Sequence, residues 1–157
     1  MKVTLSTNKT NYTMTNLKLR QANANDIDIL FEWANDNAVR QNSFNPGKIS
    51  FDNHQKWFKN KLASKNTFIY ILEKDNKKIG QIRVDFENDF WLIDYSIDKT
   101  QRGNGSGKIM IELLLQKKHL PLKAKVKIKN IASCKVFEKL DFTKTITQDN
   151  LVTYTYL

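Results

Sequence analysis

The chain has 157 residues, of which 40% are hydrophobic and 11% aromatic, and this is enough apolar material for the core of one domain of common size. The composition excludes intrinsic disorder for most of the chain, and no apolar run approaches the roughly 20 residues that a membrane-spanning helix needs. The first residues also lack the apolar stretch of a secretory signal. We therefore expect a soluble, cytoplasmic protein.

Basic residues outnumber acidic ones by 26 to 16, and the formal net charge of +10 favours a polyanionic partner such as a nucleotide, a coenzyme A type of cofactor or a nucleic acid. The excess is concentrated between Lys117 and Lys144, where nine lysines stand against Glu138 and Asp141. The lysines at positions 123, 125, 127 and 129 alternate with apolar residues, which is typical of a half-buried strand. We interpret these four lysines as the solvated face of that strand rather than as a binding patch.

Metal-binding and thiol chemistry have little support in the sequence. The single cysteine, Cys134, excludes an internal disulfide framework, and together with His54 and His119 it provides too few soft ligands for a structural zinc site. Nothing in the sequence pairs a base with Cys134, so we expect an inert buried thiol rather than a nucleophile. The sequence thus predicts no metal site.

The N-terminal half predicts an arm, a strand and two helices. Residues 1–16 contain no acidic residue and are mostly Thr, Asn and Ser, so we expect a loose arm followed by one folded domain over residues 17–157. Residues 17–21 are typical of a strand, Asn25 is the predicted cap of a first helix, and Ser50 is that of a second. The predicted buried residues are Ile27, Leu30, Phe31 and Ala34 in the first helix, and Phe51, Phe58 and Leu62 in the second.

The C-terminal half predicts six strands and two helices. The predicted strands are 67–73, 79–87, 90–98, 122–129, 142–147 and 151–156, and polar turns at 74–78 and 148–150 join two pairs of them as hairpins. One helix follows the glycine-rich segment 101–107 and ends before Pro121, and a second runs from its cap, Asn130, through Leu140. The order β-α-α-β-β-β-α-β-α-β-β predicts a single α+β domain, in which about four helices are layered on a mixed sheet.

Three alternating glycines lie between the strand 90–98 and the helix that follows it. Successive backbone N–H groups at such a connection form an anion site together with the positive end of the helix. The spacing from Gly103 to Gly107 excludes a Walker-type loop, and the late G-x-G-x-G pattern excludes the dinucleotide fingerprint. A phosphate cradle and a glycine-rich turn without a ligand are the alternatives that remain.

The neighbours of this segment favour the cradle. The strand 93–98 comes first, then Arg102-x-x-Gly105-x-Gly107, and then the helix Asn130-x-x-Ser133, which ends in Glu-Lys-Leu-x-Phe over residues 138–142. Together these segments resemble the GNAT superfamily of acyl-CoA N-acyltransferases, over a range from about Leu17 to the C-terminus. The resemblance implies a mostly antiparallel central sheet, acetyl-CoA as donor and cofactor, and a homodimer.

The resemblance also implies where the cofactor binds. Its pyrophosphate would lie on the amides of residues 103–108, and its pantetheine arm would run beside the strand of Tyr95 and reach the start of the helix at Asn130. The implied cofactor-binding residues are Ser96, Ile97, Arg102, Gly103, Asn104, Gly105, Ser106, Gly107, Lys108, Asn130, Ser133 and Phe137.

Two residues depart from the family pattern. Phe137 occupies the position at which much of the family has a tyrosine that protonates the leaving sulfur, so that acid is absent here, and Tyr95 or Ser133 are the candidates to replace it. A thiolate with a pKa of about 8.5 leaves without full proton transfer, so the reaction remains feasible. Asp141 stands where glycine is common, after the last predicted helix.

Acetyl transfer to an amine needs a neutral amine, so a carboxylate or imidazole should face the site. The candidates are Asp94, Asp85 and His54, and Asp94 comes first because its strand lies beside the expected thioester. A single histidine such as His54 more often packs against its neighbours than acts as a catalytic base. A backbone N–H of the strand at residues 95–97 can hold the oxyanion without a special side chain.

The N-terminal half narrows the acceptor. Glu-Trp-Ala-Asn-Asp at 32–36, His54-x-x-Trp57 and Ile-Gly-Gln-Ile-Arg at 79–83 resemble both the acetyltransferases of nucleotide-linked amino sugars, as in pseudaminic acid pathways, and the ribosomal-protein N-terminal acetyltransferases. We favour a small-molecule amine such as a UDP-amino sugar, with a protein N-terminus or another small amine as the alternative. The candidate substrate-binding residues are Trp33, Arg40, Phe44, Trp57, Arg83 and Asp85, although plain core packing is the commoner role of such aromatic residues.

A basic nucleic-acid-binding module is the alternative outside the enzyme class. It would use the lysine-rich half and bind RNA or DNA with a steep salt dependence. Most aromatic residues, however, come before residue 96 and the lysines gather after 117, so the interleaving of a base-stacking surface is missing. We therefore favour the enzyme.

Overall fold

The computed structural model describes residues 16–157, apart from the side chains of Ile146 and Thr147, and the predicted arm thus lies outside the described residues except for Asn16. The strands are β1 (Leu17–Gln21), β2 (Thr67–Lys74), β3 (Lys77–Glu87), β4 (Phe90–Ile97), β5 (Leu122–Lys127), β6 (Thr143–Gln148) and β7 (Leu151–Tyr156). The helices are α1 (Ile27–Ala34), α2 (Asn37–Asn42), α3 (Phe51–Ala63), α4 (Ser106–Leu115) and α5 (Ile131–Lys139), with single 3₁₀ turns at Ala24–Asp26 and Lys99–Gln101.

The strands form one seven-stranded sheet in the order β1-β2-β3-β4-β5-β7-β6. Every neighbouring pair is antiparallel except β4 and β5, which the crossover through α4 makes parallel. This confirms the predicted α+β fold with a mixed, mostly antiparallel sheet. The helix α2 was not expected, and it forms because the side chain of Asp36 accepts hydrogen bonds from the amides of Ala38 and Val39.

Three tight turns set the strand register. The pairs Asp75-Asn76, Asn88-Asp89 and Asp149-Asn150 all have positive φ, between 49° and 67°, as two-residue type I′ hairpins require. Asn and Asp tolerate this conformation better than other non-glycine residues. The predicted turn 74–78 was too long, because Lys77 and Lys78 already pair with β2.

The start of the first helical segment differs from the prediction. Asn23 rather than Asn25 provides the cap, and the residues after it form a 3₁₀ turn before α1 begins. Asp26 is completely buried, where it accepts hydrogen bonds from Arg20 and pairs with Lys78 at 2.8 Å. Within α1, Leu30 is buried as predicted and Trp33 is buried with it, whereas Ile27, Phe31 and Ala34 are only partly buried.

The second predicted helix has its cap at Ser50 as expected, but its buried face differs. Phe58 is buried as predicted, but His54, one turn earlier, is buried with it, whereas Phe51 and Leu62 are each 40% exposed. The side chain of His54 fills the space between α3 and α1 that an aliphatic residue would otherwise occupy. The polar ring can be buried because its Nε2–H donates a hydrogen bond to the carbonyl oxygen of Ile27 at 3.0 Å.

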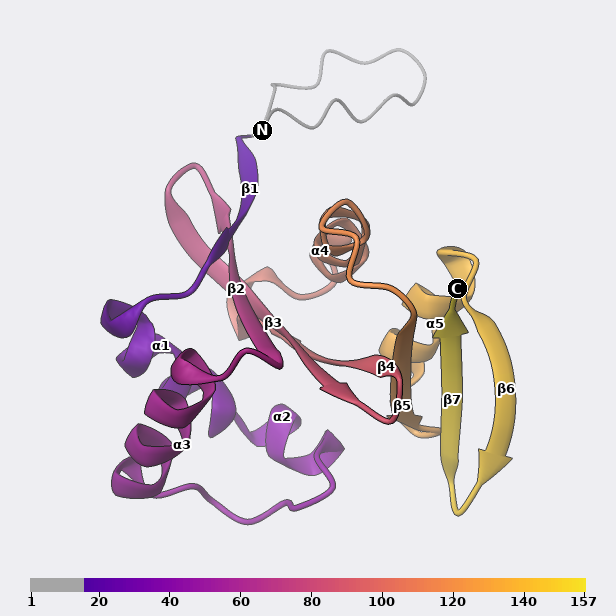
Figure 1. Cartoon of the computed structure of the whole chain (residues 1–157), viewed down its shortest axis with the longest axis horizontal. Helices are drawn as coiled ribbons and strands as arrows, with labels where there is room; N and C mark the ends of the chain where they lie inside the picture. The colour runs from indigo at the N-terminus through magenta and orange to yellow at the C-terminus, as the bar shows by residue number, and fades with distance from the viewer. Residues whose placement is uncertain (1–15) are drawn as a thin grey trace.

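The sheet separates two hydrophobic clusters. Leu30, Trp33 and Phe58 pack with Ile69 and Ile71 of β2 in the smaller one, which joins α1 and α3 to the sheet. The larger cluster holds the inner residues of α4 and α5 together with the other side of the strands. Figure 1 shows α1–α3 grouped beside the N-terminal half of the sheet and α5 next to β5 and β7. Neighbouring residues on β4 therefore point into different halves of the molecule.

Within the part of the chain that the structure describes, no helix is long and apolar enough to cross a membrane. Nor does any group of three His, Cys, Asp or Glu side chains among residues 16–157 come together as a metal site.

Candidate active site

Strands β4 and β5 pair over only two residues and then separate. The ladder joins Trp91 to Leu122 and Leu92 to Lys123, and no further pair follows. The Trp91 amide donates to Pro121 on the β5 side (2.9 Å), whereas the Asp98 amide donates to Ile79 on the β3 side (2.8 Å). Because these directions alternate along a strand, the main-chain groups of Ile93, Tyr95 and Ile97 face the gap between β4 and β5. The gap therefore offers free backbone donors and acceptors.

The first turn of α4 lies just beyond the end of β4, and its amides are uncapped. Its N-cap is Gly105, which has no side chain to accept them, and no acidic residue lies in the turn. By contrast, Asp36, Ser50 and Asn130 provide side-chain caps for α2, α3 and α5. Four amides at a helix start have no partner within the helix, and with the helix dipole they attract an anion. The start of α1 also lacks a side-chain cap, but it continues a 3₁₀ turn and has Asp28 in its first turn, so the start of α4 is the one that suits a phosphate.

The glycines of this turn are required by its backbone. Gly103 and Gly105 have φ of +79° and +77°, and a Cβ at either position would meet no atom within 4 Å, so both border open space. Gly107 serves packing instead, because a Cβ there would lie 3.3 Å from the ring of Tyr95. This geometry matches a cradle that a diphosphate approaches closely.

Arg102 is held differently from the expectation. Its Nε donates to the Ile97 carbonyl (2.9 Å), and its Nη2 pairs with Asp36 at 2.8 Å. The guanidinium thus closes the free end of the gap and ties the start of α2 to the glycine turn. Asp36 was missed by the sequence analysis, since nothing local marks a partner 66 residues away.

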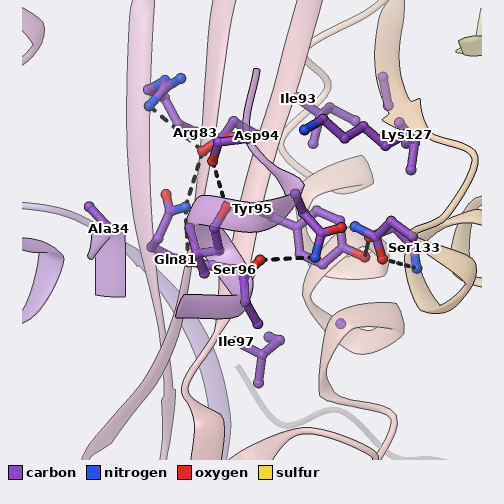
Figure 2. A pocket seen from close by; sticks show the side chains of 18 of the residues that line it. Ala34, Gln81, Arg83, Ile93, Asp94, Tyr95, Ser96, Ile97, Lys127 and Ser133 are labelled. Carbon is purple, nitrogen blue, oxygen red and sulfur yellow. Dashed lines mark hydrogen bonds and ion pairs between the residues drawn. The ribbon is translucent and has the colours of Figure 1, made fainter. Parts of the chain in front are cut away.

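On the α4 side of β4, two hydroxyl groups meet. The Tyr95 hydroxyl and Ser133 Oγ share a hydrogen bond of 2.7 Å, and the amide of Ser133 donates to Asn130, the cap of α5 (Figure 2). Burial raises the pKa of Tyr95, so its hydroxyl keeps its proton at neutral pH. Phe137 lies 6.0 Å from the Tyr95 ring and is packed in the core against Phe142 and Tyr154.

On the opposite side of β4, polar side chains form a row. The register places Gln81 opposite Ser96, and Arg83 opposite Asp94. Gln81 Nε2 donates to both Asp94 and Ser96 at 3.3 Å, and Arg83 lies 3.7 Å from Asp94 (Figure 2). The Asp94 side chain is 58% exposed, which leaves its carboxylate accessible. Gln81 was also missed, although its alternation with Arg83 and Asp85 marks a polar strand face.

Asp85 is already neutralised by its neighbours. It accepts from Lys61, Thr67 and Arg83, each at 2.7 Å. Burial alone would raise the pKa of Asp85, but Arg83, Lys61 and Thr67 bring it below its ordinary value of 3.8. An engaged carboxylate of this kind organises the site rather than accepting a proton from an amine.

A groove of about 1750 Å³ runs past these features and joins the glycine turn, the gap and the polar row. Phe44, which is 61% exposed, and Trp57 both line it, and the Arg83 guanidinium stacks 5.1 Å above the Trp57 ring. Arg40 also lines the groove, but its guanidinium donates to the carbonyls of Asn45 and Gly47 and so fastens the loop after α2.

Two predicted site residues have positions that favour packing. Trp33 is buried in the smaller cluster, where its Nε1 donates to Asp98 at 2.8 Å, and it does not line the groove. His54 borders the groove but is 2% exposed, and its Nε2 is bound to the Ile27 carbonyl. Burial lowers the pKa of His54, so the ring stays neutral at pH 7.

The sequence matches a family model described as an acetyltransferase (GNAT) domain over residues 16–143. The chain belongs to this family. It is therefore a GNAT acetyltransferase that uses acetyl-CoA, as the resemblance of the glycine loop and of α5 implied. No curated protein sequence matches the chain.

Solved structures show the same fold at low sequence identity. A domain from Methanocaldococcus jannaschii has a TM-score of 0.78 at 23% identity, and the match covers 90% of this chain and 98% of that one. The ribosomal L7/L12 α-N-protein acetyltransferase RimL in complex with coenzyme A has a TM-score of 0.78 at 18% identity, with 90% and 93% covered. The spermidine N-acetyltransferase from Vibrio cholerae, in complex with coenzyme A and spermine, has a TM-score of 0.75 at 16% identity, with 88% and 92% covered. At these identities, the likeness establishes the GNAT fold and leaves the acceptor open.

Proposed function

We propose that this GNAT enzyme acetylates the primary amine of a nucleotide-linked amino sugar and that the reaction takes place in the gap between β4 and β5. The observation that carries the proposal is the uncapped first turn of α4 beside a strand whose backbone faces that gap. Bound acetyl-CoA supplies an activated acetyl group as a thioester. The residues that would hold its diphosphate are the amides of Ser106, Gly107 and Lys108, with Gly103 and Gly105 allowing close approach.

Asp94 is the proposed proton acceptor. Its carboxylate is exposed to the groove, and Gln81 and Arg83 hold it from the β3 side without neutralising it as fully as Asp85 is neutralised. Asp94 takes the proton of the acceptor ammonium, directly or through water, so that the nitrogen lone pair is free to bond to the acetyl carbon. His54 is not assigned this role, since it is only 2% exposed and its ring is held in the core by the hydrogen bond to the Ile27 carbonyl, out of reach of an acceptor amine.

The Tyr95 amide is the proposed donor to the carbonyl oxygen of the acetyl group. It faces the gap, and the strand fixes its direction, so no reorganisation is needed as negative charge develops. Such a backbone donor leaves no trace in the sequence.

The Tyr95 side chain points to the other side of the strand, where it is the proposed proton donor to sulfur. As the carbon–sulfur bond breaks, Tyr95 gives its hydroxyl proton to the sulfur, and Ser133 stabilises the phenolate that remains through their 2.7 Å hydrogen bond. The dyad thereby replaces the hydroxyl that Phe137 lacks. One strand then carries a proton acceptor on one face and a proton donor on the other.

The groove also supports a ring-bearing acceptor. Phe44 and Trp57 present aromatic surface to it, on the same side as Asp94, and such surfaces stack on sugar or base rings. This placement is the support for an amino sugar over an unbranched amine.

Release of free thiol from acetyl-CoA in the presence of different amines tests the proposal. A UDP-linked 4-amino sugar, spermidine and short peptides with a free N-terminus form the panel. We expect the highest kcat/KM with the amino sugar. Faster turnover of a peptide would move the acceptor to a protein N-terminus, and tight RNA binding without thiol release from any amine would contradict the enzymatic proposal.

A further inference from the structure

We propose that the lysine row of β5, Lys123, Lys125 and Lys127, binds a phosphate or carboxylate group carried by the acceptor amine. The inference rests on the proposed function and deepens it, because it defines the acceptor as a molecule that has both an amine and an anion.

The row faces the acceptor side of the gap. Leu122, Ala124 and Val126 are buried in the larger cluster, so the lysines between them point to the opposite face of the strand. In the parallel ladder Leu92 pairs with Lys123, which places the lysine row on the same face as Leu92, Asp94 and Ser96. The expected solvated strand face is therefore a wall of the groove.

Individual contacts agree with this orientation. Lys127 Nζ donates to the carbonyl of Gln41 in α2 at 3.0 Å, across the groove from its own strand. Lys123 Nζ lies 3.9 Å from the centre of the Phe90 ring. Lys125 stands between them, is exposed, and lines the groove with the other two. Figure 2 shows Lys127 entering from β5, across from Asp94 and Arg83.

Several other cations of the groove already pair with carboxylates or donate to backbone carbonyls. Lys61 and Arg83 pair with Asp85 and Asp94 at 2.7 to 3.7 Å, so this group of four has no net charge. Arg40 directs its donors to the loop carbonyls of Asn45 and Gly47. Arg40 and Arg83, the residues expected to meet a diphosphate, are thus engaged.

In the part of the chain that the structure describes, the β5 lysines have no carboxylate partner, although Lys127 donates to the Gln41 carbonyl and Lys123 lies over the Phe90 ring. Among residues 16–157, no carboxylate lies within 4 Å of their ammonium groups. Three ammonium groups on alternate residues of one strand repel one another, and an anion between them relieves that repulsion. Lys48, Lys135 and Lys139 also line the groove and likewise have no carboxylate partner among residues 16–157. Only β5, however, places three such lysines in a row on one face of a strand.

The strand register sets the distance between the two binding functions. Two residues beyond the pair Leu92 and Lys123, Asp94 and Lys125 face each other across the widening gap. An acceptor that spans the gap with its amine at Asp94 would therefore have its other end beside Lys125. The chemistry at that end is an anion, either a phosphate or a carboxylate, whereas a polycationic amine would be repelled.

Matched acceptor pairs and charge-reversal variants test the inference. The pairs are a UDP-linked 4-amino sugar with the free 4-amino sugar, and serine with serinamide, so that phosphate and carboxylate are examined separately. The test variant is Lys125→Glu, and the control is Lys56→Glu, an exposed residue of α3 outside the groove.

We expect at least one anionic acceptor to have a kcat/KM about tenfold or more above that of its neutral partner, because charge-assisted hydrogen bonds are stronger than neutral ones. Lys125→Glu should remove this preference, leave the KM for acetyl-CoA unchanged and leave the neutral acceptor within about twofold of the wild type. Lys56→Glu should behave as the wild type. Equal use of both members of each pair, or an increase in the KM for acetyl-CoA in Lys125→Glu, would overturn the inference.

Calorimetric titration of the anionic acceptor, with coenzyme A saturating the glycine turn, separates the two proposals. Weaker binding in Lys125→Glu than in Lys56→Glu, without thiol release from any amine, would support the anion site and refute the proposed function. Thiol release that is indifferent to Lys125→Glu, with unchanged binding, would retain the function and refute the anion site.

Discussion

The glycine turn before α4 and the polar row of β3 and β4 both border the same groove, but they are built from different groups. At the turn, the free groups are backbone amides, and the side chains around them are absent or small. In the polar row, the groups that can bind a ligand are side chains, and most of these side chains already form hydrogen bonds or ion pairs with one another. A site made of backbone amides binds any ligand with the right charge and shape. A site made of side chains selects its ligand through the few side chains that have no partner within the protein. The first suits a cofactor shared by a whole family, and the second suits an acceptor that differs between members.

The largest effect should come from the accessible carboxylate of the polar row. Asp94→Asn should lower kcat by about 10² to 10⁴, the usual contribution of a general base, and leave the KM for acetyl-CoA unchanged. Steady-state kinetics at pH 7 measure both values, with Asp52→Asn in the first turn of α3 as the matched control. A loss of less than threefold in Asp94→Asn would remove Asp94 from the mechanism.

The glycine turn should respond to bulk and charge. Coenzyme A at about 100 times its Kd should stabilise the wild type by about 2.7 kcal/mol, which corresponds to a rise in Tm of roughly 5–10 °C for a chain of this size. Gly105→Glu should abolish this rise, because it places a carboxylate in the cradle. Gly105→Asn adds a side chain without a charge, and since asparagine tolerates positive φ, it should retain part of the rise. An undiminished rise in Gly105→Glu would show that the phosphates bind elsewhere.

The hydroxyl pair behind β4 should have a smaller effect. Tyr95→Phe should lower kcat by about tenfold at neutral pH, because a thiolate with a pKa of about 8.5 leaves even without a proton. Ser133→Ala should cost less, and the double variant should resemble Tyr95→Phe alone if the two hydroxyls act as one unit. If the decrease in kcat of the double variant equals the product of the two single decreases, the two hydroxyl groups have separate roles.

Much of the fold was readable from local signals. Asn and Asp at hairpin turns, Ser50 and Asn130 as caps, and the alternating glycines all act within a few residues, and the structure has them as expected. The predicted helix cap at Asn25 was wrong because two asparagines lie two residues apart in the sequence. The buried ion pair of Asp26 with Arg20 favours Asn23 as the cap, and the local sequence does not show this pair.

Much less of the acceptor side of the groove could be predicted from the sequence. A lysine on alternate strand positions has the same pattern whether its face meets bulk water or a groove, so the direction of the β5 row depends on the crossover that makes β5 parallel to β4. The pairing of Arg102 with Asp36 likewise joins segments that are distant in sequence. The alternation of residues in the sequence predicts which face of a strand a residue occupies. Only the sheet topology shows whether that face borders bulk water or the groove.

The smallest effect concerns the scaffold behind the acceptor side. Burial holds the pKa of His54 below its ordinary value of 6.5, so the unfolded chain binds a proton more readily than the folded one as the pH falls below 6.5. The free energy of unfolding should therefore decrease on acidification, by at most about 1.4 kcal/mol per pH unit from this group.

Urea unfolding between pH 7.5 and 5 measures this decrease. In His54→Gln, an amide that does not titrate can still donate to the Ile27 carbonyl, so the pH dependence should be shallower than in the wild type. His119, whose pKa burial also lowers, is present in both proteins, so the difference isolates His54. Identical slopes would show that His54 does not contribute to the acid sensitivity.

Backbone amide chemical shifts during a titration with coenzyme A test the central assignment most directly. We expect the largest changes at Ser106, Gly107 and Lys108, with a smaller change at the Tyr95 amide and little at Lys125. Saturable binding that leaves the three α4 amides unmoved would contradict it.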